Sequence, residues 1–192
     1  MQPRNRRHPG PTKRTAFGQA VAELIHAINV LLHAGLLLPS MMMWLATVDI
    51  LAGLARPSDA AESNGEHFRE WVERFLLPGS KLKCTAEDLW GARCGMLHTY
   101  TPVSRRSRSG RVRKVLFASG RLDESTRATT EMVTGEYVFV ISRDVFDAMS
   151  TALQRFAHAL NTDKDLERRV MVRAGDFLVP LYPTYSRERV EL

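Results

Sequence analysis

Cysteine is scarce in this chain, which has only Cys84 and Cys94 among its 192 residues. No second Cys/His pair follows at the spacing of zinc ligands, so no structural metal site is expected. The first 14 residues are basic, but no apolar run with a small-residue cleavage site follows at once, so no secretory signal is expected. Two cysteines without such a signal suggest reduced thiols and a cytoplasmic protein.

Several signatures of catalytic sites are also missing. The sequence has no phosphate-binding loop of the form GxxxxGK[ST], which leaves hydrolysis of nucleoside triphosphates without support. It has no convincing pair of carboxylates for a metal site and no internal repeat. We therefore expect no metal and no cofactor.

Charged residues are absent from positions 24–48, a stretch long enough to span a bilayer. Two histidines, an asparagine and a serine interrupt it, and Gly35 and Pro39 break it near its middle. We expect two amphipathic or buried helices joined at residues 35–39, with a transmembrane segment as the alternative, and thus no membrane partner.

Apolar residues make up 44% of the chain and charged residues 25%, as in an ordinary globular protein. The formal net charge of +6 favours acidic partners such as nucleic acid, although scattered surface arginines would give the same value. Residues 1–14 are predicted to be a disordered basic arm. Residues 15–192 are predicted to form a single domain.

Apolar periodicity predicts a mainly α fold with a small β appendage after the fourth helix. Ser63 and Asn64 are the candidates to cap the third helix, and Thr85 is predicted to cap the fourth. Strands are expected at 115–118 and 137–141. Residues 120–135 between them would form a long hairpin loop, so that the strand pair and loop together occupy residues 113–141. A third strand or a packed tail is expected at 177–181. The helices are expected at about 15–34, 39–55, 64–77, 86–101, 142–161 and 163–172.

The fourth predicted helix carries Arg93 and, five residues later, His98. Arginine has a fixed charge and a planar fork of donors that suits phosphate oxygens, and histidine transfers protons near neutral pH. The pair could therefore cleave a phosphodiester without a metal. The alternative is that Arg93 is a solvated helix residue and that His98 caps the helix C-terminus.

A basic stretch follows the histidine directly. Because like charges this close repel one another, the stretch indicates either a solvated loop or an arm that contacts phosphates. Tyr100, just past the helix, is a candidate to hydrogen-bond RNA or simply to pack. The six candidate RNA-binding cations are Arg105, Arg106, Arg108, Arg111, Arg113 and Lys114.

Four successive helices, the fourth ending in Asp-Leu-Trp-Gly-Ala-Arg-Cys-Gly-Met-Leu-His, resemble the HEPN superfamily (higher eukaryotes and prokaryotes nucleotide-binding). Its members are small, antiparallel helical bundles, and many carry Arg, four to six residues and His near the end of a late helix. Arg93 and His98 match this R-x4-H pattern, with Leu89 and Trp90 as the apolar residues before it. The chain departs at Cys94, where active members often have Asn, Asp or His.

The resemblance implies a metal-independent endoribonuclease. The ribose 2′-hydroxyl would attack the adjacent phosphorus, leaving a 2′,3′-cyclic phosphate and a 5′-hydroxyl, and DNA would not be a substrate. His98 would act as general base or acid or orient the hydroxyl, while Arg93 would stabilise the transition state. The family also suggests a role in toxin–antitoxin or antiviral defence, with an antitoxin protein as a partner.

Helix geometry places the two residues about 140° apart around an ideal helix. They should therefore not point the same way unless the helix frays near His98. A symmetric homodimer, as is typical of HEPN ribonucleases, would bring both copies of the pair around one cleft. Cys94 lies four residues before His98, so a nucleophilic Cys/His pair is a further alternative.

Three interpretations therefore stay open. The first is a homodimeric HEPN ribonuclease. The second is a non-catalytic HEPN-like module that binds RNA, nucleotide or protein, which Cys94 favours. The third is an all-α interaction protein in which R-x4-H is a coincidence.

Overall fold

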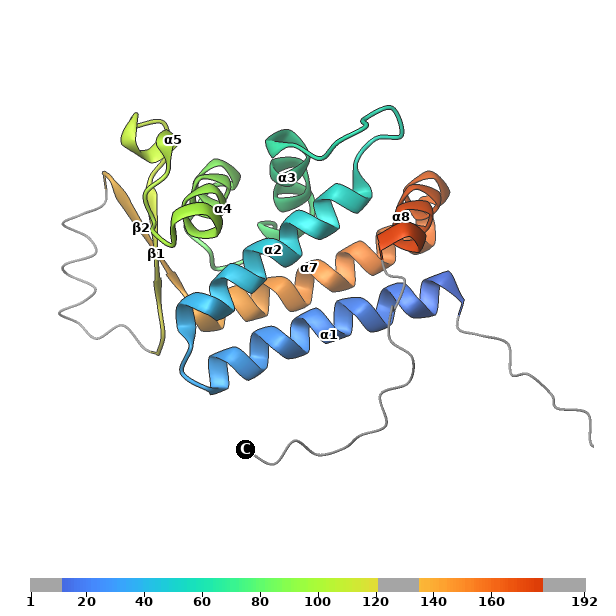
Figure 1. Cartoon of the computed structure of the whole chain (residues 1–192), viewed down its shortest axis with the longest axis horizontal. Helices are drawn as coiled ribbons and strands as arrows, with labels where there is room; N and C mark the ends of the chain where they lie inside the picture. Colours follow the sequence, from blue (N-terminus) through green and yellow to red (C-terminus); the bar gives the residue numbers. More distant parts are fainter. Residues whose placement is uncertain (1–11, 121–134, 178–192) are drawn as a thin grey trace, which may run out of the picture.

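A computed structural model describes residues 12–120 and 135–177, which form seven α-helices, one π-helix and a two-stranded sheet (Figure 1). The prediction of a mainly helical fold with a small β appendage is confirmed. The elements are α1 Lys13–His33, α2 Leu37–Ala55, α3 Gly65–Trp71, the π-helix η1 Val72–Leu76, α4 Ala86–Thr99, α5 Arg105–Arg108, β1 Lys114–Ala118, β2 Tyr137–Ile141, α7 Ser142–Thr162 and α8 Lys164–Phe177.

Helix α2 is the centre of the fold, because it contacts α1, α3, α4, α8 and β1. The predicted apolar face of this helix is buried at every position. Burying a large apolar side chain contributes about 1.5–3 kcal/mol, so this helix supplies much of the stability of the core. The buried face consists of Met41, Trp44, Leu45, Val48, Leu51 and Ala52.

Helices α1 and α2 are separate helices, as predicted, and Gly35 adopts a positive φ of 75° between them. The two helices pack on each other. Such a φ is easy for glycine and costly for most other residues. Both helices are long and apolar enough to cross a membrane by length and composition alone. Within an 18-residue hydrophobic stretch of each helix, 56% of the stretch is buried in α2 and 11% in α1.

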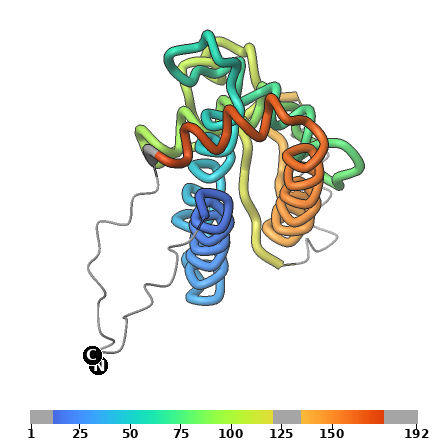
Figure 2. Tube along the Cα trace, turned by 90° about the vertical axis from the view of Figure 1, so that its right-hand side faces the viewer, coloured from blue at the N-terminus to red at the C-terminus, as the bar shows by residue number. Residues whose placement is uncertain are grey.

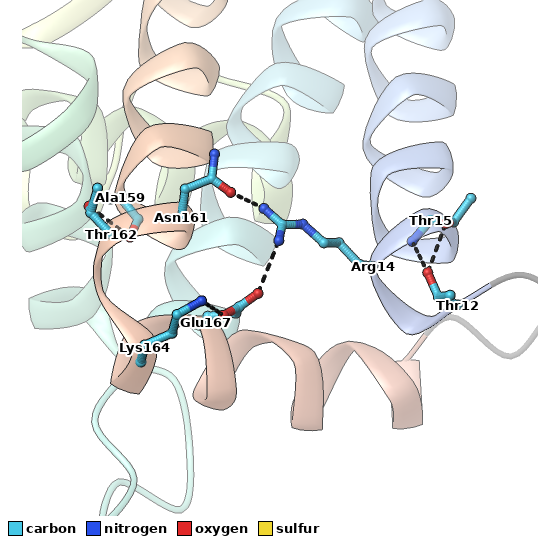
Figure 3. Close-up of polar contacts among 8 residues, drawn as sticks. All are labelled: Thr12, Arg14, Thr15, Ala159, Asn161, Thr162, Lys164 and Glu167. Atoms are coloured by element: carbon cyan, nitrogen blue, oxygen red, sulfur yellow. Dashed lines mark hydrogen bonds and ion pairs between the residues drawn. The ribbon is translucent and has the colours of Figure 1, made fainter.

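Helix α1 begins at Lys13, two residues before its predicted start, because the Thr12 side chain caps it by accepting a hydrogen bond from the Thr15 amide. The disordered arm was expected to reach Arg14, but that residue is helical. Its guanidinium donates to Asn161 and pairs with Glu167, so it links α1 to α7 and α8 (Figure 3). Residues 1–11 of the predicted arm lie outside the described part of the chain.

Both predicted helix caps are confirmed. Asn64 accepts from the first turn of α3, and Thr85 accepts from the amide of Asp88 in α4. The Asp88 carboxylate in turn accepts from the Thr85 amide, which completes a capping box. These caps fix where α4, the helix that carries Arg93 and His98, begins.

The two strands are confirmed, but the hairpin between them is wrong. Strands β1 and β2 run parallel, with Val115 opposite Val138 and Phe117 opposite Val140. A hairpin joins antiparallel neighbours, whereas parallel strands need a crossover connection. Most of the connecting residues, 121–134, lie outside the described residues. Strand β1 packs beside α4, and β2 leads directly into α7.

Helix α8 runs across the ends of α1 and α7 and contacts both (Figure 2). It extends to Phe177, beyond the predicted end at 172, so Phe177 is helical rather than the start of a strand. The rest of the predicted 177–181 element is outside the described residues. Beneath α8, the aromatic rings of Trp71, Phe75 and Phe156 pack on one another at centroid distances of 5.1–5.8 Å.

Candidate functional site

Arg93 is held in place on two sides. Its Nη2 atom donates to Asp49 Oδ2 of α2 at 2.6 Å, and its guanidinium lies 5.1 Å from the centroid of the Trp90 ring. The side chains of Arg93 and Asp49 are 21% and 24% exposed, so this ion pair is partly shielded from water. An arginine fixed in this way is preorganised, with less rotamer entropy left to lose on binding phosphate.

Arg93 and His98 lie together. Arg93 Nη1 is 3.4 Å from His98 Nε2, and α4 continues without fraying to Thr99. The expectation that a regular helix would keep them apart was therefore wrong, because the long arginine side chain spans the angle between their backbone positions. Since a guanidinium only donates, His98 Nε2 is the acceptor in this contact.

Asp49 was not predicted as a site residue. The signal for it was present, because Asp49 is the first charged residue after Glu23 and lies in an otherwise apolar helix. A single carboxylate among core residues indicates a buried or half-buried partner. Because Asp49 and Arg93 are 44 residues apart in the sequence, the identity of the cation that pairs with Asp49 could not be predicted.

Cys94 is partly buried and unpaired with the other cysteine. Burial raises the pKa of its thiol, while the positive charges of Arg93 and Arg106 oppose that rise without cancelling it. A nucleophilic cysteine needs a lowered pKa, because the thiolate is the reactive form. No hydrogen bond joins Cys94 to His98 among the described residues, so the geometry does not support a Cys/His nucleophile.

The basic segment, residues 104–114, folds back onto α4 on the side of the helix where two glycines lie. A Cβ atom on Gly91 would lie 2.7 Å from Val112, and one on Gly95 would lie 2.6 Å from the Thr101 carbonyl oxygen. Real Cβ contacts are not that short, so the close approach requires glycine at both positions. Their i, i+4 spacing places them on one face of α4, so Val112 packs against this face at Gly91, and Thr101 and Val103 pack against it at Gly95.

Three of the six predicted RNA-binding cations are ion-paired within the fold. Arg106 pairs with Glu87 at 3.2 Å, and Lys114 pairs with Glu136 at 3.3 Å. Arg113 Nη2 lies 2.6 Å from Asp88 Oδ2, and the Arg113 amide also donates to this carboxylate.

The other three cations, Arg105, Arg108 and Arg111, are exposed and have no acidic partner within residues 12–120 and 135–177. Arg105 and Arg111 line a surface hollow of about 480 Å³ together with Arg106. This hollow is not lined by Arg93 or His98. On a single chain, the Arg93–His98 pair therefore lies outside the basic hollow.

Tyr100 follows α4 directly and is 53% exposed. It is the only non-glycine residue with a positive φ in the described part of the chain, at 55°. A bulky side chain rarely adopts this conformation. The turn presents the ring to solvent two residues beyond His98, so Tyr100 is available to stack on or hydrogen-bond a ligand.

The described ranges contain no group of three His, Cys, Asp or Glu side chains placed to hold a metal ion. Comparison of the chain with protein-family models, curated proteins and solved structures finds no match.

Proposed function

We propose that this protein is a metal-independent endoribonuclease of the HEPN type. The observation that carries the proposal is the 3.4 Å contact between Arg93 and His98, with the arginine held by Asp49. This arrangement places a fixed cation and a proton-transfer group beside each other on one helix. The helical fold, with the pair near the end of α4, agrees with an HEPN-like antiparallel bundle.

The proposed reaction is a transesterification. The 2′-oxygen of ribose forms a bond to phosphorus while the bond from phosphorus to the next 5′-oxygen breaks. His98 Nε2, whose lone pair faces Arg93 Nη1 at 3.4 Å, would exchange this long contact for the 2′-hydroxyl and accept its proton. Arg93 donates to the phosphoryl oxygens as negative charge develops on them. The products are a 2′,3′-cyclic phosphate and a 5′-hydroxyl that has gained a proton.

One histidine cannot be base and acid in the same step. A two-fold homodimer would supply a second His98 to protonate the departing 5′-oxygen. The position of the pair favours this arrangement, because His98 is exposed on α4 and the pair does not line the neighbouring basic hollow. A cleft around the scissile phosphate would then form between two copies.

RNA would lie along the basic segment next to the pair. Arg105, Arg108 and Arg111 are exposed and available to phosphates, and Tyr100 is available to a base. RNA selectivity would come from the chemistry, since DNA lacks the attacking hydroxyl. We place the protein in the cytoplasm, in toxin–antitoxin or antiviral defence, with an antitoxin protein as a candidate partner.

A second candidate is a non-catalytic HEPN-like module that binds RNA, nucleotide or protein. Two observations favour it. Asp49 partly neutralises Arg93, and Cys94 occupies the position after the arginine where active HEPN proteins often have a polar residue. In this case RNA affinity would depend on the exposed arginines and not on His98.

The test is cleavage of a fluorescent RNA pool in EDTA by wild type, His98→Ala and His158→Ala. His158 is an exposed histidine on α7 and serves as the matched control. We expect wild type and His158→Ala to leave cyclic-phosphate ends, and His98→Ala to leave none. A DNA copy of the pool should remain intact.

Two results would reject catalysis by this pair: equal cleavage by His98→Ala, or no cleavage by wild type at concentrations that populate a dimer. A binding measurement then tests the second candidate, in which RNA affinity should persist in His98→Ala and fall when Arg105, Arg108 and Arg111 are replaced by Gln. The salt dependence of this affinity gives the number of phosphate contacts. If three phosphates contact the three exposed arginines, log affinity should fall with log salt at a slope of roughly −2, against roughly −4 for all six cations.

A further inference from the structure

A second cavity, of about 290 Å³, lies between the C-terminal end of α2, the α3–η1 segment and α8. It shares no lining residue with the Arg93–His98 pair. Three arginines line it, Arg56, Arg74 and Arg169, against one acid, Glu70. The cavity therefore has a surplus of positive charge in its lining.

Arg56 satisfies its donors on carbonyl oxygens and not on carboxylates. It donates to Gly53, Ala60 and Ala61 at 2.6–3.0 Å. Next to it, Arg173 likewise donates only to carbonyl oxygens among the described residues. Burial, and then the nearby charges of Arg56 and Arg169, lower the pKa of Arg173. The arginines thus crowd one another, and an anion would relieve their repulsion.

The acids around the cavity neutralise it only in part. Asp165 is shared, since Arg168 and Arg169 both pair with it, at 2.6 and 3.1 Å. Arg74 reaches Asp163 only at 3.9 Å, with both side chains well exposed. An exposed pair of this kind stabilises little. Arg74 and Arg169 therefore keep donors for a ligand.

Other polar atoms of the lining residues are hydrogen-bond donors as well. Trp71 is 2% exposed, and its indole Nε1 is buried with no acceptor. Arg169 Nε is also buried with no acceptor. His67 Nδ1 accepts from the Asn64 amide, which leaves the ring proton on Nε2 as a further donor. The Trp71 indole and the His67 ring therefore add no free hydrogen-bond acceptor to the lining, which suits a ligand that carries acceptors itself.

We propose that this cavity binds a small phosphate-bearing molecule. A phosphate group has only acceptor oxygens at neutral pH and matches the fork of an arginine. The volume is at the lower end of the range of small-molecule pockets, which favours a compact ligand over a nucleic-acid chain. This site is independent of the ribonuclease proposal, and either can fail alone.

Indole nitrogen NMR with sodium pyrophosphate as the probe tests the site. Trp44 and Trp71 both have a buried indole Nε1 without an acceptor, but only Trp71 lines this cavity. We expect pyrophosphate to shift the Trp71 indole signal and leave that of Trp44 unchanged. Sodium chloride at equal ionic strength should shift neither. A conservative Trp71→Phe variant assigns the signal.

Two neighbouring arginines give a charge-matched comparison. Arg168 and Arg169 pair with the same Asp165, but only Arg169 lines the cavity. Arg169→Gln should weaken pyrophosphate binding about tenfold, as loss of a charged hydrogen bond does, and Arg168→Gln by less than about twofold. Circular dichroism checks that both variants fold.

Three results would overturn the proposal. The first is a Trp71 signal that does not respond to pyrophosphate. The second is equal weakening by Arg168→Gln and Arg169→Gln, which would indicate general charge screening. The third is a response to a 5′-phosphorylated RNA oligonucleotide without one to pyrophosphate, which would assign the cavity to an RNA end.

Discussion

The ion pair between Asp88 and Arg113 gives the sharpest test of how the basic segment is held. The Asp88 side chain is 4% exposed, and Arg113 Nε and Nη2 both donate to its Oδ2 atom, at 3.1 and 2.6 Å. Arg113 Nη2 also donates to the Lys83 carbonyl oxygen. Arg113 was predicted to bind RNA, and its contacts within the fold also give it a structural role. We therefore predict that Arg113→Gln destabilises the fold.

The magnitude follows from the burial of the carboxylate. Removing one partner of a buried ion pair costs about 3–5 kcal/mol, because the other charge is left uncompensated. Asp88 would keep its hydrogen bonds from the Thr85 and Arg113 amides, which favours the lower end of that range. A loss of about 3 kcal/mol should lower the melting temperature of a chain of this length by roughly 6–12 °C.

The effect should depend on pH. Burial opposes ionisation of Asp88, but hydrogen bonds from Arg113 and Thr85 outweigh it and lower the pKa of the carboxyl. A lowered pKa in the folded state stabilises the protein above the ordinary aspartate pKa of about 3.9. This stabilisation is lost as pH falls through the lowered value, so the gap between wild type and Arg113→Gln should narrow in acid.

Urea unfolding followed by circular dichroism, at pH 7 and near pH 3.5, measures both effects. Arg111→Gln is the control, since it removes one positive charge from the same segment at an exposed position. It should change the free energy of unfolding by no more than about 0.5 kcal/mol. If the two variants were equally stable at pH 7, the structural role of Arg113 would be refuted.

Two further predictions concern packing. Gly95→Ala should destabilise the fold by about 1–3 kcal/mol, because the new methyl group would meet the Thr101 carbonyl oxygen. Gly18→Ala, in open space on α1, should stabilise the fold by up to about 1 kcal/mol. Thermal unfolding of the two variants and wild type measures both effects. Cys84, whose burial raises the pKa of its thiol to about 12, should not react with dithiobis(nitrobenzoate) at pH 8, while the partly exposed Cys94 reacts slowly. We expect one thiol per chain to react in the native protein and two in urea. Reaction of both thiols in the native protein would contradict the burial of Cys84.

Local patterns in the sequence were enough to predict most of the fold. The six apolar positions of α2 were identified from periodicity because one helix face repeats every three or four residues. The caps at Asn64 and Thr85 were also predictable, since capping involves residues two or three apart. These features depend on neighbours in the chain and not on tertiary structure.

Contacts between distant residues were not predictable in the same way. The parallel pairing of β1 and β2 depends on the path of the connecting chain, and the partner of Arg93 lies 44 residues away at Asp49. The contact between Arg93 and His98 was missed for another reason. Backbone angles alone separate the two residues around the helix, and the long side chain of Arg93 closes that separation.

The basic segment shows how a run of like charges becomes compatible with a fold. Its cations repel one another, and acids from neighbouring elements compensate half of them: Glu87 and Asp88 on α4, and Glu136 beside β2. Each of these pairs ties the segment to the helix that carries His98 or to the sheet. The positive charge left for an acidic ligand is therefore smaller than the sequence suggests, and it lies on the exposed side chains of Arg105, Arg108 and Arg111. A segment whose backbone is tied down by three ion pairs presents these charges at defined places on the surface, which favours ordered phosphate contacts over diffuse attraction to any polyanion.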